Sequence, residues 1–455
     1  MGDSFIEEHL KTPVADKYDV IVVGGGASGS VAAIAAARSG ARTLILERTG
    51  CLGGTATVNL VAQWVAFFHH DTRVVGGIPY ELTQKVIEMG GSEGFHRYVM
   101  GEAAGTPFGL KTLPLNPEVV KIALDDAASK AGAEVLFHTT FSRSLMESDR
   151  IKGAVVETVA GRKAYLAKTV IDATGDAAVA ASAGVSFLSS DNDSRGKRQP
   201  CTLSFRLSNV DVAAFRAVPS AERRRLVLGG LERGELFWQS LSFVSTPGET
   251  DALCLMSRIL GIDALSEKDA SRAEQEGRRQ IDSIVRFLKR EIPGFKNAIL
   301  ADIAERVGVR ETRRIEGLHV FSEEDIMQER AFDDAIALGA GPMDRHEEKG
   351  TGITLYAPPA PFEIPLRALL PKKVQSLIVP GRAFSATREA MAGARHMATC
   401  MAMGQAAGTL AALAAKSDRL PAQVAPKEVQ ERLKSTGALF KREHLGARQA
   451  TEASA

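Results

Sequence analysis

The sequence predicts an α/β protein in which a mainly parallel sheet is assembled from distant parts of the chain, with a second, β-rich α+β domain inserted. Three observations predict this fold class. Apolar runs that end in glycine or other small residues recur at 20–29, 169–176 and 377–386. A helical pattern and another apolar run follow the first of them, as in a βαβ unit. Residues 186–360 have a different pattern, with segments in which apolar and polar residues alternate and one long charged helix.

The individual elements follow from the same patterns. Val20 to Val23 is a continuous apolar run, as expected for a strand that is covered on both faces. A small-residue helix over 29–39 closes at Gly40, and a second strand spans 43–46. Further elements are predicted as a helix over 116–132, strands over 133–138, 151–158 and 164–175, a charged helix near 268–290, a strand ending near 381, a small-residue helix from Gly404 to Ala415, and a surface helix near 426–440.

Composition limits the class of protein. A chain of 455 residues is too long for one simple core and predicts several domains. Lysine plus arginine (56) balances aspartate plus glutamate (55), which gives no electrostatic reason to expect nucleic acid or membrane as partners. The charged first residues lack the apolar segment of a signal peptide. The four cysteines form no CxxC, which argues against a metal site or a redox pair and favours a reduced, cytoplasmic protein.

The first glycine cluster is a dinucleotide fingerprint. Gly24, Gly26 and Gly29 fit GxGxxG: the first allows a tight turn, the second lets backbone approach a pyrophosphate, and the third lets the helix pack on the strand. The N–H groups at the start of the helix favour an anion. Glu47 ends the second strand, where a carboxylate accepts hydrogen bonds from a ribose. FAD and NAD share this pattern, so the fingerprint alone leaves the choice open.

Four later segments favour FAD. "GCLGGTAT" (50–57) places a second glycine-rich turn directly after the Glu47 strand, and "TVIDATGD" (169–176) and "LIVPGRAFSA" (377–386) are strands ending in small residues. The fourth segment is the helix expected to start around Gly404 to Gly408, whose N–H groups would face the charge of a reduced flavin. Packing alone does not account for all four in this order.

These segments resemble the FAD-dependent oxidoreductases of the large glutathione-reductase-type Rossmann superfamily, in the branch near the fumarate reductase and succinate dehydrogenase flavoproteins. The resemblance runs nearly end to end and includes "QPCTLSFRL", "RVGVRETRRIEG", "IPLRALLP", "VPGRAFSATREA" and "HMATCMAMGQAAGTLAAL". It implies a Rossmann-type FAD-binding domain with an inserted substrate domain. The domains would be FAD-binding parts at 17–70, 116–185 and 361–420, a cap segment at 71–115, the substrate domain at 186–360, and a C-terminal helix and tail at 421–455.

The resemblance also implies which residues hold FAD. The pyrophosphate would lie on Gly24, Gly26, Ala27, Ser28 and Gly29, and the adenosine ribose on Glu47, next to Arg48. The flavin side would follow Gly54, Thr55, Ala56 and Thr57, and adenine would lie near Phe141. Ala173, Thr174 and Gly175 would pass the adenosine half, and Gly381, Arg382, Gln405, Ala406 and Ala407 would surround the ribityl chain and the pyrimidine edge.

Two departures from related flavoproteins narrow the chemistry. No histidine occurs between Glu47 and His69, so a covalent histidyl link to FAD is not expected. A second GxGxxG and a CxxxxC are absent, so a bound nicotinamide domain is not expected either, although an NAD(P)H that only visits stays open.

Catalytic residues are less clearly marked. His396 and Arg395 precede the small-residue helix, and each has a structural alternative: a packed histidine, or an arginine at a helix end. Arg313, with Arg310 and Arg314, offers recognition of an anionic substrate or a structural pair with Glu311. His69 and His70 are weaker candidates, and Cys51 and Cys400 are expected to be packing thiols. No metal site is predicted.

The function expected from this reading is FAD-dependent oxidation of a small organic substrate by hydride transfer to flavin N5, with reoxidation by oxygen, a quinone or another acceptor. The alternatives among flavoenzymes are a reductase of the fumarate-reductase kind and a monooxygenase. The alternative from another class is a non-redox flavin-binding or tRNA-modification-like protein. The substrate, the acceptor, the direction of reaction and any homo-oligomeric state stay open.

Overall fold

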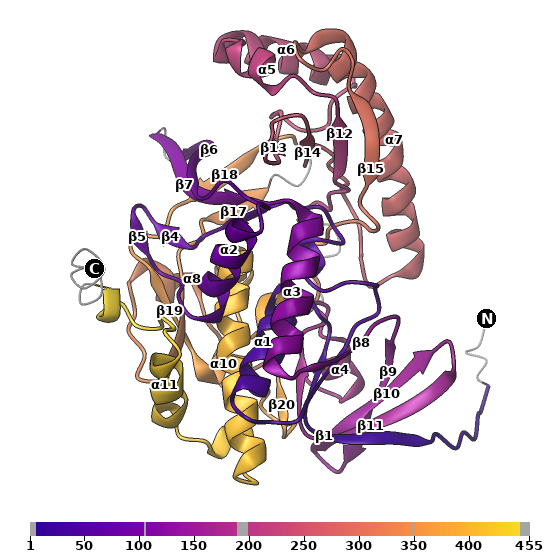
Figure 1. Ribbon diagram of the computed structural model, residues 1–455, viewed down its shortest axis with the longest axis vertical. Coiled ribbons are helices and arrows are strands. Elements are labelled where there is room, and N and C mark those ends of the chain that lie inside the picture. The colour runs from indigo at the N-terminus through magenta and orange to yellow at the C-terminus, as the bar shows by residue number, and fades with distance from the viewer. Residues whose placement is uncertain (1–5, 104–105, 189–198, 347–349, 446–455) are drawn as a thin grey trace.

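The computed structural model describes residues 6–103, 106–188, 199–346 and 350–445. The C-terminal tail of the predicted segment 421–455 therefore lies partly outside the described residues. Within them the chain forms a mixed sheet with packed helices, and a second lobe lies at the far end of the molecule from the strands β9, β10 and β11 (Figure 1). The predicted α/β class is confirmed.

The main sheet has the strand order β8-β2-β1-β11-β10-β9, with β20 paired to β11. Strands β8, β2, β1, β11 and β20 are parallel, whereas β9, β10 and β11 form an antiparallel meander. The bounds are β1 Val14–Val23, β2 Thr43–Leu46, β8 Glu134–Leu136, β9 Thr140–Glu147, β10 Arg150–Thr158, β11 Gly161–Asp172 and β20 Leu377–Ile378. Segments from the N-terminal, middle and C-terminal parts of the chain therefore share one sheet.

Among the described residues, four helices pack on this sheet: α1 Ala27–Arg38, α3 Pro117–Ala131, α4 Ala178–Ser182 and α10 Met397–Lys416. Other helices pack on these helices or on smaller sheets: α2 Ile78–Glu88, α8 Glu323–Met327, α9 Arg388–Ala394 and α11 Pro426–Ser435. Helices α1 and α10 pack against each other at the centre (Figure 1). Smaller sheets surround them: β3 Gln63–Val65 with β6 His96–Ala103 and β7 Thr106–Pro114, β4 Phe68–His69 with β5 Thr72–Arg73, β16 Ala335–Gly339 with β19 Phe362–Pro365, and β17 Met343–His346 with β18 Ile353–Tyr356.

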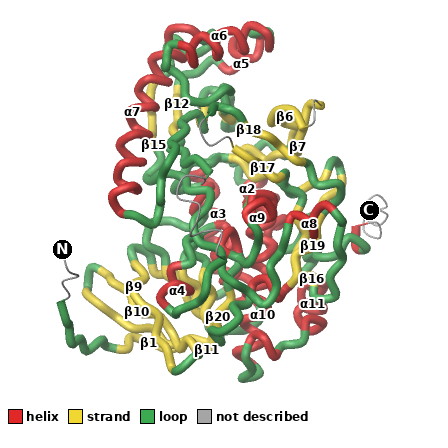
Figure 2. The backbone as a smooth tube through the Cα atoms, turned by 180° about the vertical axis from the view of Figure 1, so that it is seen from behind, coloured by secondary structure: helices red, strands yellow, loops and turns green. Residues whose placement is uncertain are grey.

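The inserted lobe has its own core, formed by buried residues between Cys201 and Val307. Its sheet has the order β13-β14-β12-β15, and Figure 2 shows the long helix α7 running beside it. The bounds are β12 Phe205–Ser208, α5 Val212–Ala217, α6 Ser220–Glu232, β13 Phe243–Ser245, β14 Ala252–Cys254, α7 Glu267–Glu291 and β15 Ile299–Ile303. Buried residues from Phe321 to Met343 pack instead into the main core, although the sequence assigns them to the 186–360 segment.

The predicted start of the small-residue helix at Gly404 is wrong, because α10 begins at Met397 after an N-cap at His396. Gly404 and Gly408 lie inside the helix, where they allow close contact with α1. A Cβ at Gly404 would lie 2.2 Å from the carbonyl oxygen of Ser28, and one at Gly408 would lie 2.0 Å from that of Ala32. The small residues therefore serve a helix crossing and not a helix start. In the described part of the chain α10 is the one helix long and apolar enough to cross a membrane, and it is almost entirely buried inside the protein.

The helix crossing can be tested by replacing Gly408 with alanine. The added Cβ meets the backbone of α1, which a side-chain rotation does not relieve, so we expect a loss of about 1–3 kcal/mol in the free energy of unfolding. Denaturant unfolding of the purified protein measures it.

Gly229→Ala is the matched control. Gly229 also lies within a helix, but its nearest neighbour is the flexible end of Arg233, so alanine should leave stability unchanged or raise it by about 0.5–1 kcal/mol. Equal stability of Gly408→Ala and the wild type would contradict the close crossing.

Candidate functional site

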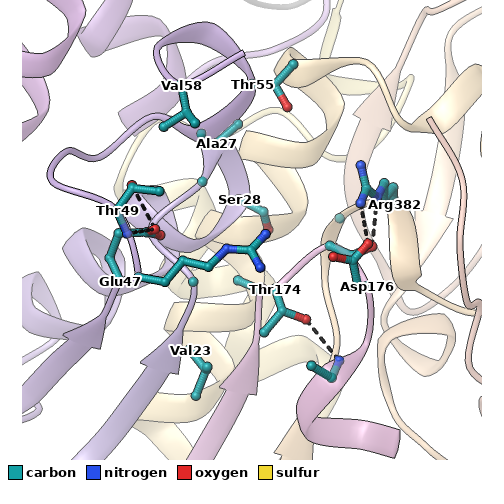
Figure 3. Close-up of a pocket in the computed structure, with 18 of the residues that line it drawn as sticks. Val23, Ala27, Ser28, Glu47, Thr49, Thr55, Val58, Thr174, Asp176 and Arg382 are labelled. Carbon is teal, nitrogen blue, oxygen red and sulfur yellow. Dashed lines mark hydrogen bonds and ion pairs between the residues drawn. The ribbon is translucent and has the colours of Figure 1, made fainter. Parts of the chain in front are cut away.

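A pocket lies where the parallel strands β1, β2 and β11 end, at the start of α1 (Figure 3). Ligands of open α/β sheets bind at this carboxyl edge. The pocket has an empty volume of about 1210 Å³, counting its open mouth. Segments from both ends and the middle of the chain line it, and the inserted lobe contributes Arg306.

The three fingerprint glycines have three different surroundings. Gly24 has φ +97°, and a Cβ there would lie 2.6 Å from the carbonyl oxygen of Ala173. A Cβ at Gly29 would lie 1.8 Å from the carbonyl oxygen of Gly24. Gly26 has φ −69° and a Cβ there would meet nothing within 4 Å, although Gly26 lines the pocket. Gly24 and Gly29 are therefore required by packing, whereas Gly26 leaves room for a ligand.

The second glycine turn docks on the first. The N–H of Gly53 donates to the carbonyl of Gly25 at 2.9 Å, and a Cβ at Gly54 would lie 2.9 Å from Cα of Gly26. Gly54 and Thr55 line the pocket. Ala56 and Thr57 are buried behind them, and the Thr57 hydroxyl donates to the carbonyl of Leu52 at 2.7 Å.

The Glu47 carboxylate is held at the edge of the pocket by donors from Gly25 and Thr49. Its Oε2 accepts from the N–H of Gly25 at 2.6 Å, and its Oε1 accepts from the N–H and the hydroxyl of Thr49 at 2.8 and 2.9 Å. A carboxylate offers about four acceptor positions. Three are used, which leaves one for a hydroxyl group of a bound ribose.

Ser28 provides the clearest sign of a missing polar partner. Its Oγ is buried and has no hydrogen-bond partner within the described residues, and Figure 3 shows Ser28 beside the pocket in the first turn of α1. A buried hydroxyl without a partner costs about 1–3 kcal/mol unless a ligand or water satisfies it. With the open side of Gly26, this atom fits the pyrophosphate of FAD, and Glu47 fits its ribose.

The loop after β11 is fixed by buried hydrogen bonds. Asp172 accepts from the N–H and hydroxyl of Thr174 at 3.1 and 2.7 Å and from the N–H of Ala180 at 2.9 Å, and burial raises the pKa of its carboxyl group. The Arg382 guanidinium donates to the carbonyl of Gly175 at 2.7 Å and to Asp176 at 2.6 Å (Figure 3). It also donates to the carbonyl of Val309 in the segment that leaves the inserted lobe. Arg382 thus joins three segments at the pocket wall.

Most residues that the sequence marks for the cofactor line this pocket. They are Gly24, Gly26, Ala27, Ser28, Glu47, Arg48, Gly54, Thr55, Phe141, Ala173, Thr174, Gly175, Gly381 and Arg382. Gly29, Ala56, Thr57, Gln405, Ala406 and Ala407 are not among the lining residues. Gln405 lies within α10 and accepts from the N–H of Ile78 at 3.0 Å, because the helix starts two turns earlier than expected.

The sequence patterns did not predict several of the residues that line the pocket. Asp176 directly follows the "ATG" turn, and Thr49 lies two residues after Glu47. Their closeness in sequence to predicted cofactor residues could have identified both as lining residues. Met397 and Cys400 lie in the first turn of α10, and placing that start correctly would have found them. Arg306 comes from the inserted lobe and no local pattern marks it.

The three catalytic candidates lie in different surroundings. Arg395 lines the pocket and bonds Asp344. His396 is not a lining residue; its Nε2 lies 3.2 Å from the carbonyl oxygen of Pro342, and burial lowers its pKa. Arg313 is not a lining residue either, since its guanidinium donates to the carbonyl of Asp176 at 3.2 Å and lies over the ring of Phe187.

The weaker candidates also have structural surroundings. Arg314 is buried, and its Nε donates to the carbonyl of Ala386 at 2.9 Å. His69 lies 3.2 Å from the carbonyl oxygen of Pro358 and contacts the ring of His70. Cys51 is half-buried, and burial raises the pKa of its thiol. Over the described ranges, no group of three or more His, Cys, Asp or Glu side chains is arranged to hold a metal ion.

The different roles of the glycines can be separated by two alanine variants. Gly26→Ala adds a Cβ that only a bound pyrophosphate would meet. We expect the free energy of unfolding of the apoprotein to change by less than about 1 kcal/mol, and the Kd for FAD to rise about tenfold or more. Gly24→Ala should instead destabilise the fold by about 1–3 kcal/mol, because its Cβ meets the Ala173 carbonyl at positive φ.

FAD titration followed by flavin fluorescence, together with unfolding of the apoprotein, measures both effects. Wild-type FAD affinity in Gly26→Ala would show that the pyrophosphate does not lie against this residue.

Parts of the chain are similar to known proteins. The chain is 40% identical to 4-oxocyclohexanecarboxylate 2-dehydrogenase of Sinomonas cyclohexanicum over 63 residues, 14% of this chain and 11% of that protein. It is 28% identical to digeranylgeranylglycerophospholipid reductase of Methanosarcina acetivorans over 175 residues, 35% of this chain and 38% of that protein. These matches thus span well under half of either relative.

Among solved structures, a geranylgeranyl bacteriochlorophyll reductase-like protein from Thermoplasma acidophilum has a similar fold, with a TM-score of 0.50 and 18% identity over 92% of this chain and 83% of that one. The model of the family described as FAD dependent oxidoreductase matches residues 19–433, which is most of the chain. The protein therefore belongs to the FAD-dependent oxidoreductases: it is an enzyme, and its cofactor is FAD.

Proposed function

We propose that the enzyme oxidises a small organic molecule by removing a hydride, and that the electrons pass on to oxygen, a quinone or another acceptor. Bound FAD supplies the hydride-accepting chemistry. The protein then has to hold the substrate, keep water away and move a proton. The residues expected to do this are Arg395, which lines the pocket near the start of α10, and His396, which lies next to it in the sequence but is not a lining residue.

The observation that carries this proposal is the lining of the pocket. It includes Glu47 and Thr49, which suit a ribose, and also Arg395, Met397 and Cys400 at the start of α10. A pocket lined by both segments suits an extended cofactor together with side chains that are able to bind a substrate. Met397 and Cys400 are largely buried and supply apolar surface there. Burial raises the pKa of the Cys400 thiol to about 12, so it is no nucleophile at neutral pH.

His396 is the proposed proton acceptor. Because a carbonyl oxygen only accepts hydrogen bonds, the contact with Pro342 requires the proton on Nε2, which leaves Nδ1 as an acceptor. Burial lowers the pKa of His396, so the ring is neutral at neutral pH and ready to accept. Arg313 has no such role in the proposal, since its guanidinium is engaged by the Asp176 carbonyl and the Phe187 ring.

Two further parts of the proposal rest on the sequence. FAD is held without a covalent histidyl bond, because the chain between Glu47 and His69 has no histidine. A reductase of the fumarate-reductase kind and a monooxygenase use the same cofactor and stay as alternatives. The cytoplasmic location stays a prediction from the cysteine content.

Anaerobic reduction of the purified holoenzyme tests the direction of the reaction. We expect amines, hydroxy acids or sugars in a panel of small organic compounds to bleach the flavin absorbance, and oxygen or a quinone to restore it. Heat-released FAD in the supernatant is the control for a non-covalent cofactor.

Bleaching by NAD(P)H, with no bleaching by any organic compound, would contradict the proposal. That result would favour the reductase or the monooxygenase.

A further inference from the structure

A row of buried polar side chains leads from the inserted lobe to the pocket. Nη1 of Arg258 lies 2.9 Å from Nδ1 of His346, Nε2 of His346 lies 3.4 Å from Oδ2 of Asp344, and that oxygen accepts from Nη2 of Arg395 at 2.5 Å. The side chains of His346 and Asp344 are only 4% and 9% exposed. Arg395, at 16%, is the member that lines the pocket.

The hydrogen positions in this row follow from its first and last members. A guanidinium only donates, so Nδ1 of His346 accepts from Arg258 and the imidazole proton lies on Nε2, directed at Asp344. Burial lowers the pKa of His346 to about 4, so the ring is neutral. Burial opposes the charge on Asp344, but Arg395 and His346 hold the pKa of its carboxyl group well below the usual range. Asp344 is thus a carboxylate that fixes the direction of Arg395.

Gln199 completes the support of this arginine. Its Oε1 accepts from Nη2 of Arg395 at 3.0 Å, and its Nε2 donates to the carbonyl of Asp344 at 3.0 Å. A guanidinium held by two side chains loses little further conformational freedom when it binds an anion, and such preorganisation favours binding.

Positive charge exceeds negative charge around Asp344. Arg310 is near enough to feel the charges of Arg395 and Asp344, and its described hydrogen bonds go to the carbonyl of Pro200 and the hydroxyl of Thr202, which are neutral. Burial and the positive charge of Arg395 lower the pKa of Arg310 to about 10. One carboxylate is therefore set against the guanidinium groups of Arg395, Arg310 and Arg258, and buried charge of one sign is costly without a counterion.

The ion pair itself is incompletely satisfied. Nε of Arg395 and Oδ1 of Asp344 are both buried without a hydrogen-bond partner among the described residues. Each lies next to the atom that forms the Arg395–Asp344 contact, so the two orphan atoms flank it. Only Nε is a donor, so it is the atom of this pair that a bound carboxylate would satisfy, whereas Oδ1 accepts only from a donor. Unpaired buried polar groups are rare in folded proteins and call for an explanation such as a bound group.

We propose that Arg395, fixed by Asp344 and supported by the charge of Arg310, binds the carboxylate of the substrate, so that the enzyme acts on small organic acids. This inference rests on the proposed function, in which the enzyme oxidises a small organic substrate. A guanidinium selects a carboxylate over a neutral group of the same shape through its charge and its N–H donors. Nη2 of Arg395 is used by Asp344 and Gln199, whereas Nε has no partner among the described residues.

The test measures binding without turnover, so it stands apart from the bleaching experiment. The holoenzyme is titrated with acetate and benzoate, and with acetamide and benzamide as uncharged counterparts, and the change in the flavin absorption spectrum reports occupancy. We expect the wild type to bind the carboxylates at least about tenfold more tightly than the amides.

Three variants locate this preference. Arg395→Met should weaken carboxylate binding by about tenfold or more while the Kd for FAD stays within about threefold. Arg395→Lys should give an intermediate loss, because an ammonium group keeps the charge but not the fork, and it serves where the methionine variant fails to fold. Arg345→Met is the matched control, since Arg345 is exposed on β17 beside Asp344 and carries the same charge.

Three results would overturn the inference. The first is that the amides bind as tightly as the acids, and the second is that no carboxylate of the panel binds. The third is that Arg395→Met and Arg395→Lys bind carboxylates as tightly as the wild type does. A loss of FAD binding in Arg395→Lys, with Arg345→Met unaffected, would also overturn it, because Arg395 would then belong to the cofactor and not to the substrate.

Discussion

The close approach of the α1 backbone to its neighbours is the constraint on which the rest of the structure depends. The carbonyl of Gly24 lies where a Cβ of Gly29 would be, and the carbonyl of Ser28 lies where a Cβ of Gly404 would be. Neither contact leaves room for a side chain. Together they fix the first turn of α1 between strand β1 and helix α10, at the floor of the pocket. The position of Ser28 and the open side of Gly26 follow from this packing, so cofactor binding and core packing rest on the same glycines.

The inserted lobe is joined to this floor by polar groups. Arg382 donates hydrogen bonds to Gly175, Asp176 and Val309, and Asn59 donates to the carbonyl of Arg306 at 2.8 Å. Arg382 and its acceptors lie where the chain crosses between the FAD-binding part and the lobe. Directional bonds of this kind set the relative placement of the two parts more tightly than apolar contact alone. Arg306, which the lobe contributes to the pocket, is thereby held in the pocket wall.

Local motifs predicted the fingerprint turn, the β1-α1-β2 unit and the position of Glu47 directly after β2, because short-range geometry dictates them. The turn at Gly24 has φ +97°, a conformation that favours glycine. The predicted start of α10 was wrong for an equally physical reason: a stretch of small residues suits both a helix start and a helix crossing. Only the position of α1, distant in sequence, decides between the two. The same limit applies to Arg306, which reaches the pocket through the fold of another lobe.

The carboxylate site was visible in the sequence only in part. Arg395 was marked because it precedes a recognisable helix, but no motif in the sequence marks Asp344, His346 or Arg258. What brings them together is the pairing of β17 with β18 and the packing of β17 against α9. Buried networks of this kind depend on contacts between distant segments, so a single sequence does not reveal them.

A crystal structure of the enzyme with FAD bound tests the central claim most directly. The account predicts that a pyrophosphate oxygen lies about 3 Å from Oγ of Ser28 and against Gly26, and that a ribose hydroxyl donates to Glu47. The far end of FAD should lie beside Arg395 and Met397. A pyrophosphate bound elsewhere, with Ser28 Oγ still without a partner, would contradict it.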